Sequence, residues 1–145
     1  MAAERGLVLD ANILIRLVLG AKVRDLVLTY LGDVAFFSPV EYFDDARKYL
    51  PDLLSRRGID PAPALEVLDY FEQLIRPLEE TVYAGARDEA LARIEQRDAR
   101  DWPILAAALT LGCPIWTEDQ DFFGAGVPTW TTDRVELYLN ANAVR

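Results

Sequence analysis

The sequence contains no histidine, and its 145 residues include a single cysteine, Cys113. Without histidine the protein cannot form a Ser–His–Asp triad, a Cys/His zinc site or a site that uses histidine as a general base. A lone cysteine cannot form an internal disulfide, and we therefore expect a cytoplasmic protein. Any catalytic chemistry has to come from other side chains.

Long apolar runs and positive charge are also scarce. No run is long enough to cross a bilayer, and the first residues lack the features of a signal peptide, so we expect no membrane association. Lys and Arg number 15 against 24 Asp and Glu, which gives a net charge of −9. Such a balance argues weakly against bulk attraction to nucleic acid. It is still compatible with a nuclease, because metal-binding carboxylates add negative charge that a bound cation then offsets.

What the sequence has in quantity is apolar residues, at 52%, and we expect one domain over residues 1–145. Short apolar runs predict buried strands over residues 6–9, 34–37, 78–83, 113–116 and 127–130. Between them, helical spacing predicts helices over residues 13–20, 23–31, 39–57, 61–76, 86–96, 101–111 and from 132 onward. This order predicts an α/β fold, a three-layer α/β/α sandwich with a mainly parallel central sheet.

Local signals fix several of these boundaries. Ser38 and Pro39 are typical of a helix cap and first turn, and Pro77 is expected to end the helix before it. Thr132 and Asp133 are expected to cap the last helix.

Acidic residues follow the predicted strands or begin the adjacent helices. Asp10 comes after the first strand, Asp101 stands at a helix start, and Asp119 follows the fourth strand. Each of them alone is explained by helix capping or a turn. Together they converge, because the carboxyl ends of parallel strands meet at one crevice. Unpaired carboxylates repel each other, so such a cluster favours a bound cation, and oxygen ligands select Mg²⁺ or Mn²⁺.

A further acid is expected from the third predicted helix, where Glu41, Asp44 and Asp45 all lie near the start. At about 100° per residue, Asp45 lies closest to the edge of the apolar face, and the other two point further into solvent. Acids in a first turn also suit the helix dipole, so the pattern alone does not choose among the three.

Three segments carry a resemblance to a known family. They are Leu9-Asp10-Ala11-Asn12, the helix that begins Asp101-Trp102-Pro103, and the stretch Ile115-Trp-Thr-Glu-Asp-Gln-Asp-Phe122. They resemble the signature segments of PIN domains, a ribonuclease family that includes the VapC-type toxins of toxin–antitoxin pairs. The resemblance extends from Val8 to about Thr131.

The resemblance implies a Mg²⁺- or Mn²⁺-dependent endoribonuclease with an RNA substrate, an antitoxin partner and a homodimeric state. Its implied metal ligands are Asp10, Asp101, Asp119 and the additional Asp121. Its implied supporting residues are Asn12 and Thr117. The family usually has Glu as the fourth catalytic acid, whereas Asp45, one methylene shorter, is best placed here. Asp98 is an outer candidate for which a solvated turn is the favoured interpretation.

Two other functions fit parts of the pattern. A PIN fold with a weakened fourth acid could serve as a binding module. A phosphoaspartate switch or phosphatase would use Asp10 as nucleophile and usually needs a lysine at a later strand tip. The only lysines are Lys22 and Lys48, both before the third strand, and Asn12 replaces the second aspartate of that chemistry. The nuclease is therefore the favoured prediction.

Overall fold

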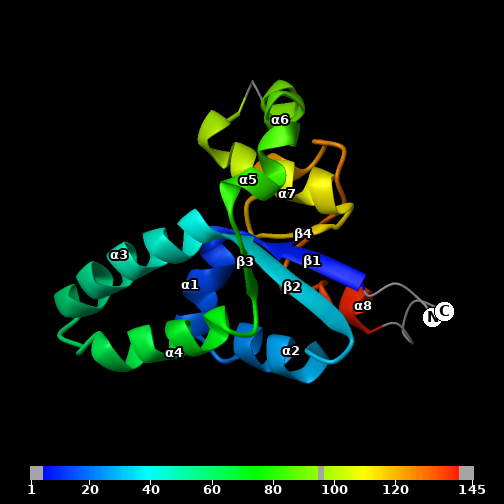
Figure 1. The fold of residues 1–145 in the computed structure, drawn as a ribbon. Coiled ribbons are helices and arrows are strands. Elements are labelled where there is room, and N and C mark those ends of the chain that lie inside the picture. Colours follow the sequence, from blue (N-terminus) through cyan, green and yellow to red (C-terminus); the bar gives the residue numbers. More distant parts are fainter. Residues whose placement is uncertain (1–4, 95–96, 141–145) are drawn as a thin grey trace.

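The computed structural model describes residues 5–94 and 97–140. Within them, five strands form one sheet (Figure 1). The strands are β1 (Arg5–Leu9), β2 (Val34–Pro39), β3 (Arg76–Leu78), β4 (Ile115–Trp116) and β5 (Thr129–Trp130). They lie in the order β3-β2-β1-β4-β5, and each neighbouring pair is parallel. The predicted α/β fold is confirmed, with a sheet that is parallel at every pairing in this part of the chain.

The chain changes direction across the sheet at β1. It passes from β1 outward to β2 and β3, and then returns to place β4 on the other side of β1. The backbone N–H of Asp10 donates to the carbonyl of Trp116 at 3.0 Å, which carries the pairing to the ends of both strands. Ligands of open α/β sheets bind at such a switch point, outside the carboxyl ends of the strands. The fold therefore brings the residues that follow β1 and β4 together there.

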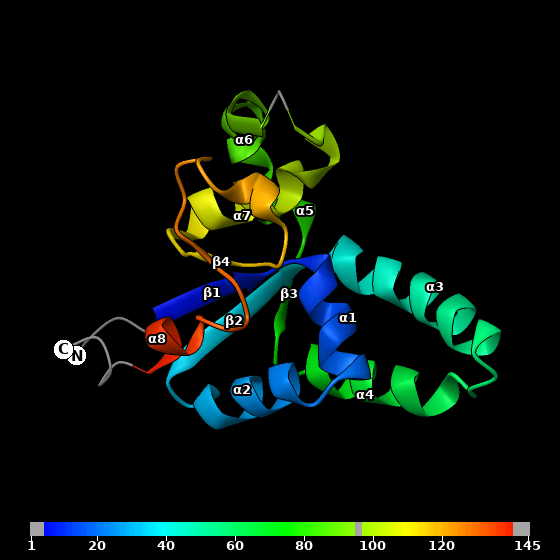
Figure 2. The ribbon, with the colours of Figure 1, turned by 180° about the vertical axis from the view of Figure 1, so that it is seen from behind.

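Helices cover both faces of the sheet (Figures 1 and 2). One face carries α5 (Glu80–Tyr83), α6 (Arg87–Ile94) and α7 (Trp102–Leu111), and the other carries α1 (Ala11–Leu19), α2 (Lys22–Tyr30) and α4 (Ala62–Glu72). The long helix α3 (Val40–Arg56) leaves the sheet and forms a helical hairpin with α4. Three 3₁₀ turns and a short last helix complete the described chain: η1 (Ala84–Ala86), η2 (Ala99–Asp101), η3 (Gln120–Phe122) and α8 (Glu136–Leu139).

The core explains why α7 lacks a polar face. Ile104 to Ala108 are all buried, because α7 packs on β1, β2 and β4 and is covered by α5 and α6. A helix that is apolar all round is one buried on all sides. As predicted, Asp101 precedes this helix, Pro103 lies in its first turn, and Gly112 ends it with a left-handed φ of 66°. The start of α7, with Asp101, is thereby fixed against the sheet.

The third strand was predicted over residues 78–83, which is wrong. The strand is Arg76–Leu78, and Glu80–Tyr83 form helix α5. Pro77 does not end α4, which stops at Glu72, but lies in β3. Proline is tolerated there because β3 is an edge strand, where a missing N–H costs no ladder hydrogen bond. The β-branched Thr81 and Val82 favoured a strand by propensity, and tertiary packing overrides this preference.

The predicted caps at Ser38, Thr132 and Asp133 are also wrong, because each side chain bonds elsewhere. Ser38 is buried in β2 and donates to the carbonyl of Leu9 at 2.8 Å. Thr132 accepts from Nε1 of Trp116 at 3.1 Å, and Asp133 accepts from the hydroxyl of Thr131.

The remaining boundaries shift in the same region. The last helix begins at Glu136, and β4 and β5 are shorter than predicted. The end of the helix predicted over residues 86–96 lies outside the described residues. In the described part of the chain, none of the helices has the length and apolar character needed to span a membrane.

Candidate catalytic site

Asp10 lies at the centre of the candidate site, at the end of β1 and at the N-cap of α1. Its side chain is buried, with 6% of the residue exposed. Oδ1 accepts a hydrogen bond from the N–H of Ala11 at 2.7 Å. Oδ2 accepts from the hydroxyl of Thr117 at 2.6 Å and from Nδ2 of Asn12 at 3.2 Å. Asp10 is therefore a helix cap, as the pattern allowed, and also part of a polar cluster.

The charge of Asp10 is unfavourable in this position. Burial raises the pKa of the Asp10 carboxyl, and the negative charge of Asp119 raises it further. The hydrogen bonds from Thr117, Ala11 and Asn12 act in the opposite direction and favour the charged form. No basic side chain is among the groups that mainly set this pKa. A cation beside Asp10 would supply the positive charge that these neighbours do not.

Asn12 and Thr117 link the ends of β1 and β4. Nδ2 of Asn12 donates to Oγ1 of Thr117 at 3.2 Å, and its Oδ1 accepts from the N–H of Glu118 at 3.2 Å. Oγ1 of Thr117 also accepts from the N–H of Asp119 at 2.9 Å. The structure thus brings together Asp10, both residues predicted to support it, and the backbone of Asp119.

Asp101 approaches the same region from the other face of the sheet. It is half-buried at the start of α7 and makes no side-chain capping hydrogen bond. Tyr42 of α3 is buried, and its pKa is raised by burial and also by the negative charges of Asp10 and Asp101. The charges of both carboxylates therefore act on one buried tyrosine.

The remaining predicted acids differ in environment. Asp119 is half-buried in the loop after β4. Asp121 lies in η3, and its side chain is outside what the structure describes. Asp98 caps η2 and forms a 2.8 Å ion pair with Arg100, which lowers the pKa of Asp98. Asp98 is thus occupied in a turn, the favoured interpretation of this residue.

The chemistry of the donors fits Mg²⁺ or Mn²⁺, while their positions are not preformed. Carboxylate, amide and hydroxyl oxygens are the ligands that these cations prefer. Among the described residues, however, no three Asp, Glu, Cys or His side chains are close enough to hold a metal ion. Metal binding by Asp10, Asp101 and Asp119 stays a prediction.

Asp45 lies beside this cluster. With Asn12 it lines a cleft of about 480 Å³ between α1 and α3. The other residues that line this cleft are Ala11, Ile15, Arg16, Ala46 and Tyr49. The side chain of Asp45 is exposed, and it shares the cleft with a residue that contacts Asp10 directly.

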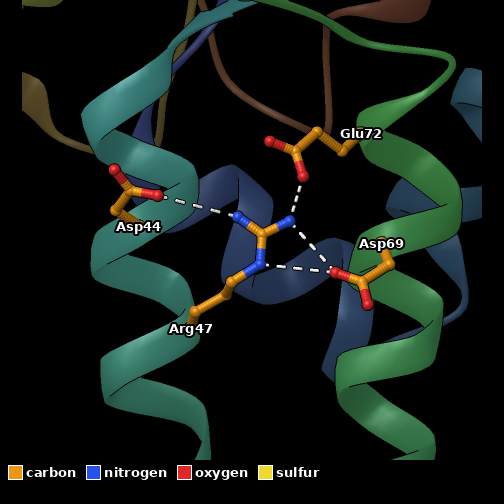
Figure 3. A network of polar contacts seen from close by, with 4 residues as sticks. All are labelled: Asp44, Arg47, Asp69 and Glu72. Atoms are coloured by element: carbon orange, nitrogen blue, oxygen red, sulfur yellow. Dashed lines mark hydrogen bonds and ion pairs between the residues drawn. The ribbon is translucent and has the colours of Figure 1, made fainter.

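Asp44 pairs with Arg47 of its own helix, and Arg47 reaches across to α4 (Figure 3). Asp44 lies 3.8 Å from the guanidinium of Arg47, which is also 3.0 Å from Asp69 and paired with Glu72. These contacts join α3 to α4. Asp44 was predicted to point further into solvent than Asp45; it is exposed, and it belongs to this interhelical network.

Glu41 is bound to a third group of residues. It accepts a 3.1 Å hydrogen bond from the hydroxyl of Tyr83, whose ring lies 5.6 Å from that of Trp102. The guanidinium of Arg87 lies over the Trp102 ring, 5.1 Å from the ring centroid. These residues connect α3 to the start of α7 next to Asp101.

Sequence reasoning missed Tyr42, Tyr83, Trp102 and Arg87. Tyr42 and Trp102 directly follow the candidate acids Glu41 and Asp101 in the sequence, whereas Tyr83 and Arg87 adjoin neither of them. That adjacency does not say which aromatic residues from separate segments will meet.

Comparisons with known proteins agree with this fold. A family model described as the PIN domain matches residues 8–140. No curated protein sequence matches the chain. One similar solved structure is a crystal structure of VapBC2 from Rickettsia felis bound to a DNA fragment from its promoter. That match has 12% sequence identity and a TM-score of 0.64, and it covers 87% of this chain and 98% of the other.

Proposed function

Because the chain belongs to the PIN domain family, we propose that it is a Mg²⁺- or Mn²⁺-dependent endoribonuclease that cleaves RNA phosphodiester bonds. The observation that carries this proposal is the buried Asp10 at the switch point of the sheet, bonded to Asn12 and Thr117 and influenced by Asp119. Burying a carboxylate without a basic partner costs free energy, and groups perturbed in this way are concentrated at functional sites.

In this proposal Asp10, Asp101 and Asp119 hold the cation, with Asp121 as an additional ligand and Asp45 as the fourth catalytic acid. A bound divalent cation would lower the pKa of the attacking water and neutralise negative charge on the phosphodiester. Thr117 and Asn12 orient Asp10 by fixing its Oδ2. Because the sequence has no histidine, the carboxylates are the general-base candidates of this site, and Asp45 borders the open cleft.

We further infer that the protein is the toxin of a toxin–antitoxin pair. The fold is similar to that of a chain in the structure of VapBC2 bound to a DNA fragment from its promoter. The same proposal includes an antitoxin partner and a homodimer. It also includes a cytoplasmic location, where the protein would meet RNA and the antitoxin. Induced expression in a bacterial host should arrest growth, and co-expression of a small neighbouring reading frame should restore it. Growth arrest that no neighbouring frame relieves would remove the antitoxin from the proposal.

The direct test of the nuclease is cleavage of a mixed-sequence RNA pool with Mg²⁺ or Mn²⁺, using Asp10→Asn as the inactive control. Cleavage should need the metal and should be lost in the variant. Equal cleavage by the protein and the variant would indicate a contaminating nuclease and overturn the assignment of Asp10.

One observation favours a second candidate, a PIN-fold binding module. The acid on α3, Asp45, is one methylene shorter than the Glu that the family usually has as its fourth acid, and its side chain is exposed. The same assay separates the two functions, because a binding module would bind Mn²⁺ and leave the RNA uncut at every metal concentration.

A further inference from the structure

One side of α1 is more open than the other, although Ala11 and Ile15 on this side are partly buried against the core. Ile13, Leu14, Leu17 and Val18 are buried, whereas Leu19, at 42% exposure, is not. The open side also carries Ala11, Asn12, Ile15 and Arg16. Positions that recur every three or four residues share a helix face, so these residues form a continuous strip.

Two clefts lie along this strip. The first is the cleft of about 480 Å³ that contains Asn12, Asp45 and Tyr49. The second, of about 270 Å³, lies further along α1 and is lined by residues that include Leu19 and Lys22. Ile15 and Arg16 line both clefts, so the two adjoin. Together they form a track that begins at the candidate site and leads away from it.

The track combines apolar walls with positive charge. Tyr49 is 52% exposed and Ile15 is half-buried, while Arg16 and Lys22 are exposed. Neither Arg16 nor Lys22 takes part in an ion pair among residues 5–94 and 97–140. Both are basic groups in a chain with a net charge of −9, and the charge of Lys22 also acts on nearby Asp133. They would complement a polyanion that passes this site.

We propose that this track, defined by the two clefts, binds a short single-stranded RNA segment beside the bond that is cleaved. A base lies against the Tyr49 ring in the first cleft, and Arg16 contacts a backbone phosphate between the clefts. The next nucleotide occupies the second cleft, where Lys22 contacts its phosphate. Aromatic and apolar surfaces that stack bases, with cations that follow the backbone, are how proteins hold single strands. The inference rests on the proposed ribonuclease function and adds the residues that bind the substrate.

Charge and continuity favour RNA as the occupant over a segment of protein. A protein helix could cover Ile15, Leu19 and Tyr49, but it would have to supply acids opposite Arg16 and Lys22. An RNA strand supplies one phosphate per nucleotide, and the first cleft shares Asn12 and Asp45 with the candidate site. The substrate would then pass directly from the track to the carboxylates.

The test measures binding of a fluorescein-labelled single-stranded RNA hexamer by anisotropy. The background is Asp10→Asn at constant Mg²⁺, with a gel to verify that the RNA stays intact. Tyr49→Ala should weaken binding roughly 5- to 150-fold, the loss of one stacked base, and Tyr49→Phe should bind like the parent. Tyr70→Ala is the matched control, because Tyr70 is 54% exposed on α4. A hexamer with abasic positions should bind with the same affinity whether residue 49 is Tyr or has been changed by Tyr49→Ala.

The charge contacts are tested by varying the NaCl concentration. Arg16→Gln and Lys22→Gln should each reduce the slope of log K against log salt by about 0.7, the value for one phosphate of a single strand. Arg57→Gln, which removes an equally exposed charge at the end of α3, should leave the slope unchanged. All of these positions are on the surface, and circular dichroism melts will verify folding.

The outcomes separate this inference from the proposed function. One outcome is that RNA binding depends on Tyr49, Arg16 and Lys22 as expected, while the protein without any substitution does not cleave RNA. This outcome supports the track and overturns the nuclease. Cleavage that needs metal and Asp10, with hexamer binding unchanged in all three variants, overturns the track alone. The latter result would leave the clefts to a protein partner.

Discussion

The hydroxyl of Thr117 donates a 2.6 Å hydrogen bond to Oδ2 of Asp10, although 107 positions separate the two residues in the chain. The bond crosses from the end of β4 to the end of β1, and it is buried. The same hydroxyl accepts from the N–H of Asp119. One threonine therefore orients the central carboxylate of the candidate site and holds the loop that carries a second carboxylate.

The first prediction concerns this threonine. Thr117→Val keeps the shape of the side chain but leaves Oδ2 of Asp10 with fewer donors and the N–H of Asp119 without its acceptor. Unpaired buried polar groups cost about 1–3 kcal/mol each, so the free energy of unfolding should fall by about that amount. Urea denaturation measures this change. Thr110→Val, at an exposed position of α7, is the control and should alter stability by less than about 0.5 kcal/mol.

The second prediction concerns metal binding. Mn²⁺ should raise the melting temperature, because a ligand that binds only the native state stabilises it by about 2.7 kcal/mol at 100 times its dissociation constant. Asp10→Asn should abolish this rise, and calorimetric titration should show the loss of Mn²⁺ binding. Unchanged binding in that variant would rule out a site that contains Asp10.

Asp119 provides a separate check of the same site. Its charge raises the pKa of Asp10, so in the metal-free protein Asp119→Asn should relieve repulsion and raise the melting temperature. The backbone N–H that donates to Thr117 is retained in this variant. A loss of more than about 1 kcal/mol in the metal-free state would instead identify Asp119 as a structural residue.

The sequence was sufficient to predict strands β1 and β2, the parallel sheet class, and the placement of Asp10, Asp101 and Asp119 next to strand ends or helix starts, because these depend on local patterns. Buried runs such as Leu7 to Leu9 identify strands, and residues after parallel strands share one edge. The environments of Glu41, Asp44 and Asp45 were not predictable in this way. Helical spacing gives the direction of a side chain, but not the segment that it meets. Glu41 bonds to Tyr83, and Arg47 pairs with Asp69 and Glu72 of α4, and the pattern does not fix where these segments lie relative to α3.

The errors have a similar cause. Ser38 has the sequence features of a helix cap, yet in the folded chain its hydroxyl satisfies the carbonyl of Leu9 in the adjacent strand. Propensity describes an isolated segment, whereas a buried polar group takes whichever partner tertiary packing supplies.

The third prediction concerns the close contact of Gly6 with Cys113. A Cβ at Gly6 would lie 2.4 Å from Sγ of Cys113 and 3.2 Å from the Phe37 ring. Gly6→Ala should therefore cost about 1–3 kcal/mol by overpacking. Adding Cys113→Ala removes the sulfur and should restore part of the loss, with a coupling energy of about 1 kcal/mol in a double-mutant cycle. Gly32→Ala, which meets no atom within 4 Å, is the control; additive costs at positions 6 and 113 would contradict the contact.

The fourth prediction concerns the titration of Cys113. Burial raises the pKa of its thiol above the ordinary value of 9.0. Because the folded state holds this proton more tightly, the associated stability is complete below pH 9 and is lost as the pH rises through the folded-state pKa. Alkylation by iodoacetamide at pH 8 should be slower for the folded protein than for the protein in urea, since the thiolate is the reactive form. Equal rates in the two states would contradict the raised pKa.

The last prediction identifies the acid of α3. Asp45→Asn should greatly reduce RNA cleavage, because Asp45 shares a cleft with Asn12, which contacts Asp10. Asp44→Asn should retain most activity and lose about 0.2–1 kcal/mol of stability, because its partner is the half-exposed Arg47. Glu41→Gln should also retain most activity, since the amide oxygen can still accept from Tyr83. The short Asp45 side chain should make activity prefer Mn²⁺ over Mg²⁺, which demands near-ideal octahedral geometry. Initial rates with each metal and urea melts of the three variants measure both effects, and a loss of activity confined to Asp44→Asn would transfer the role to that residue.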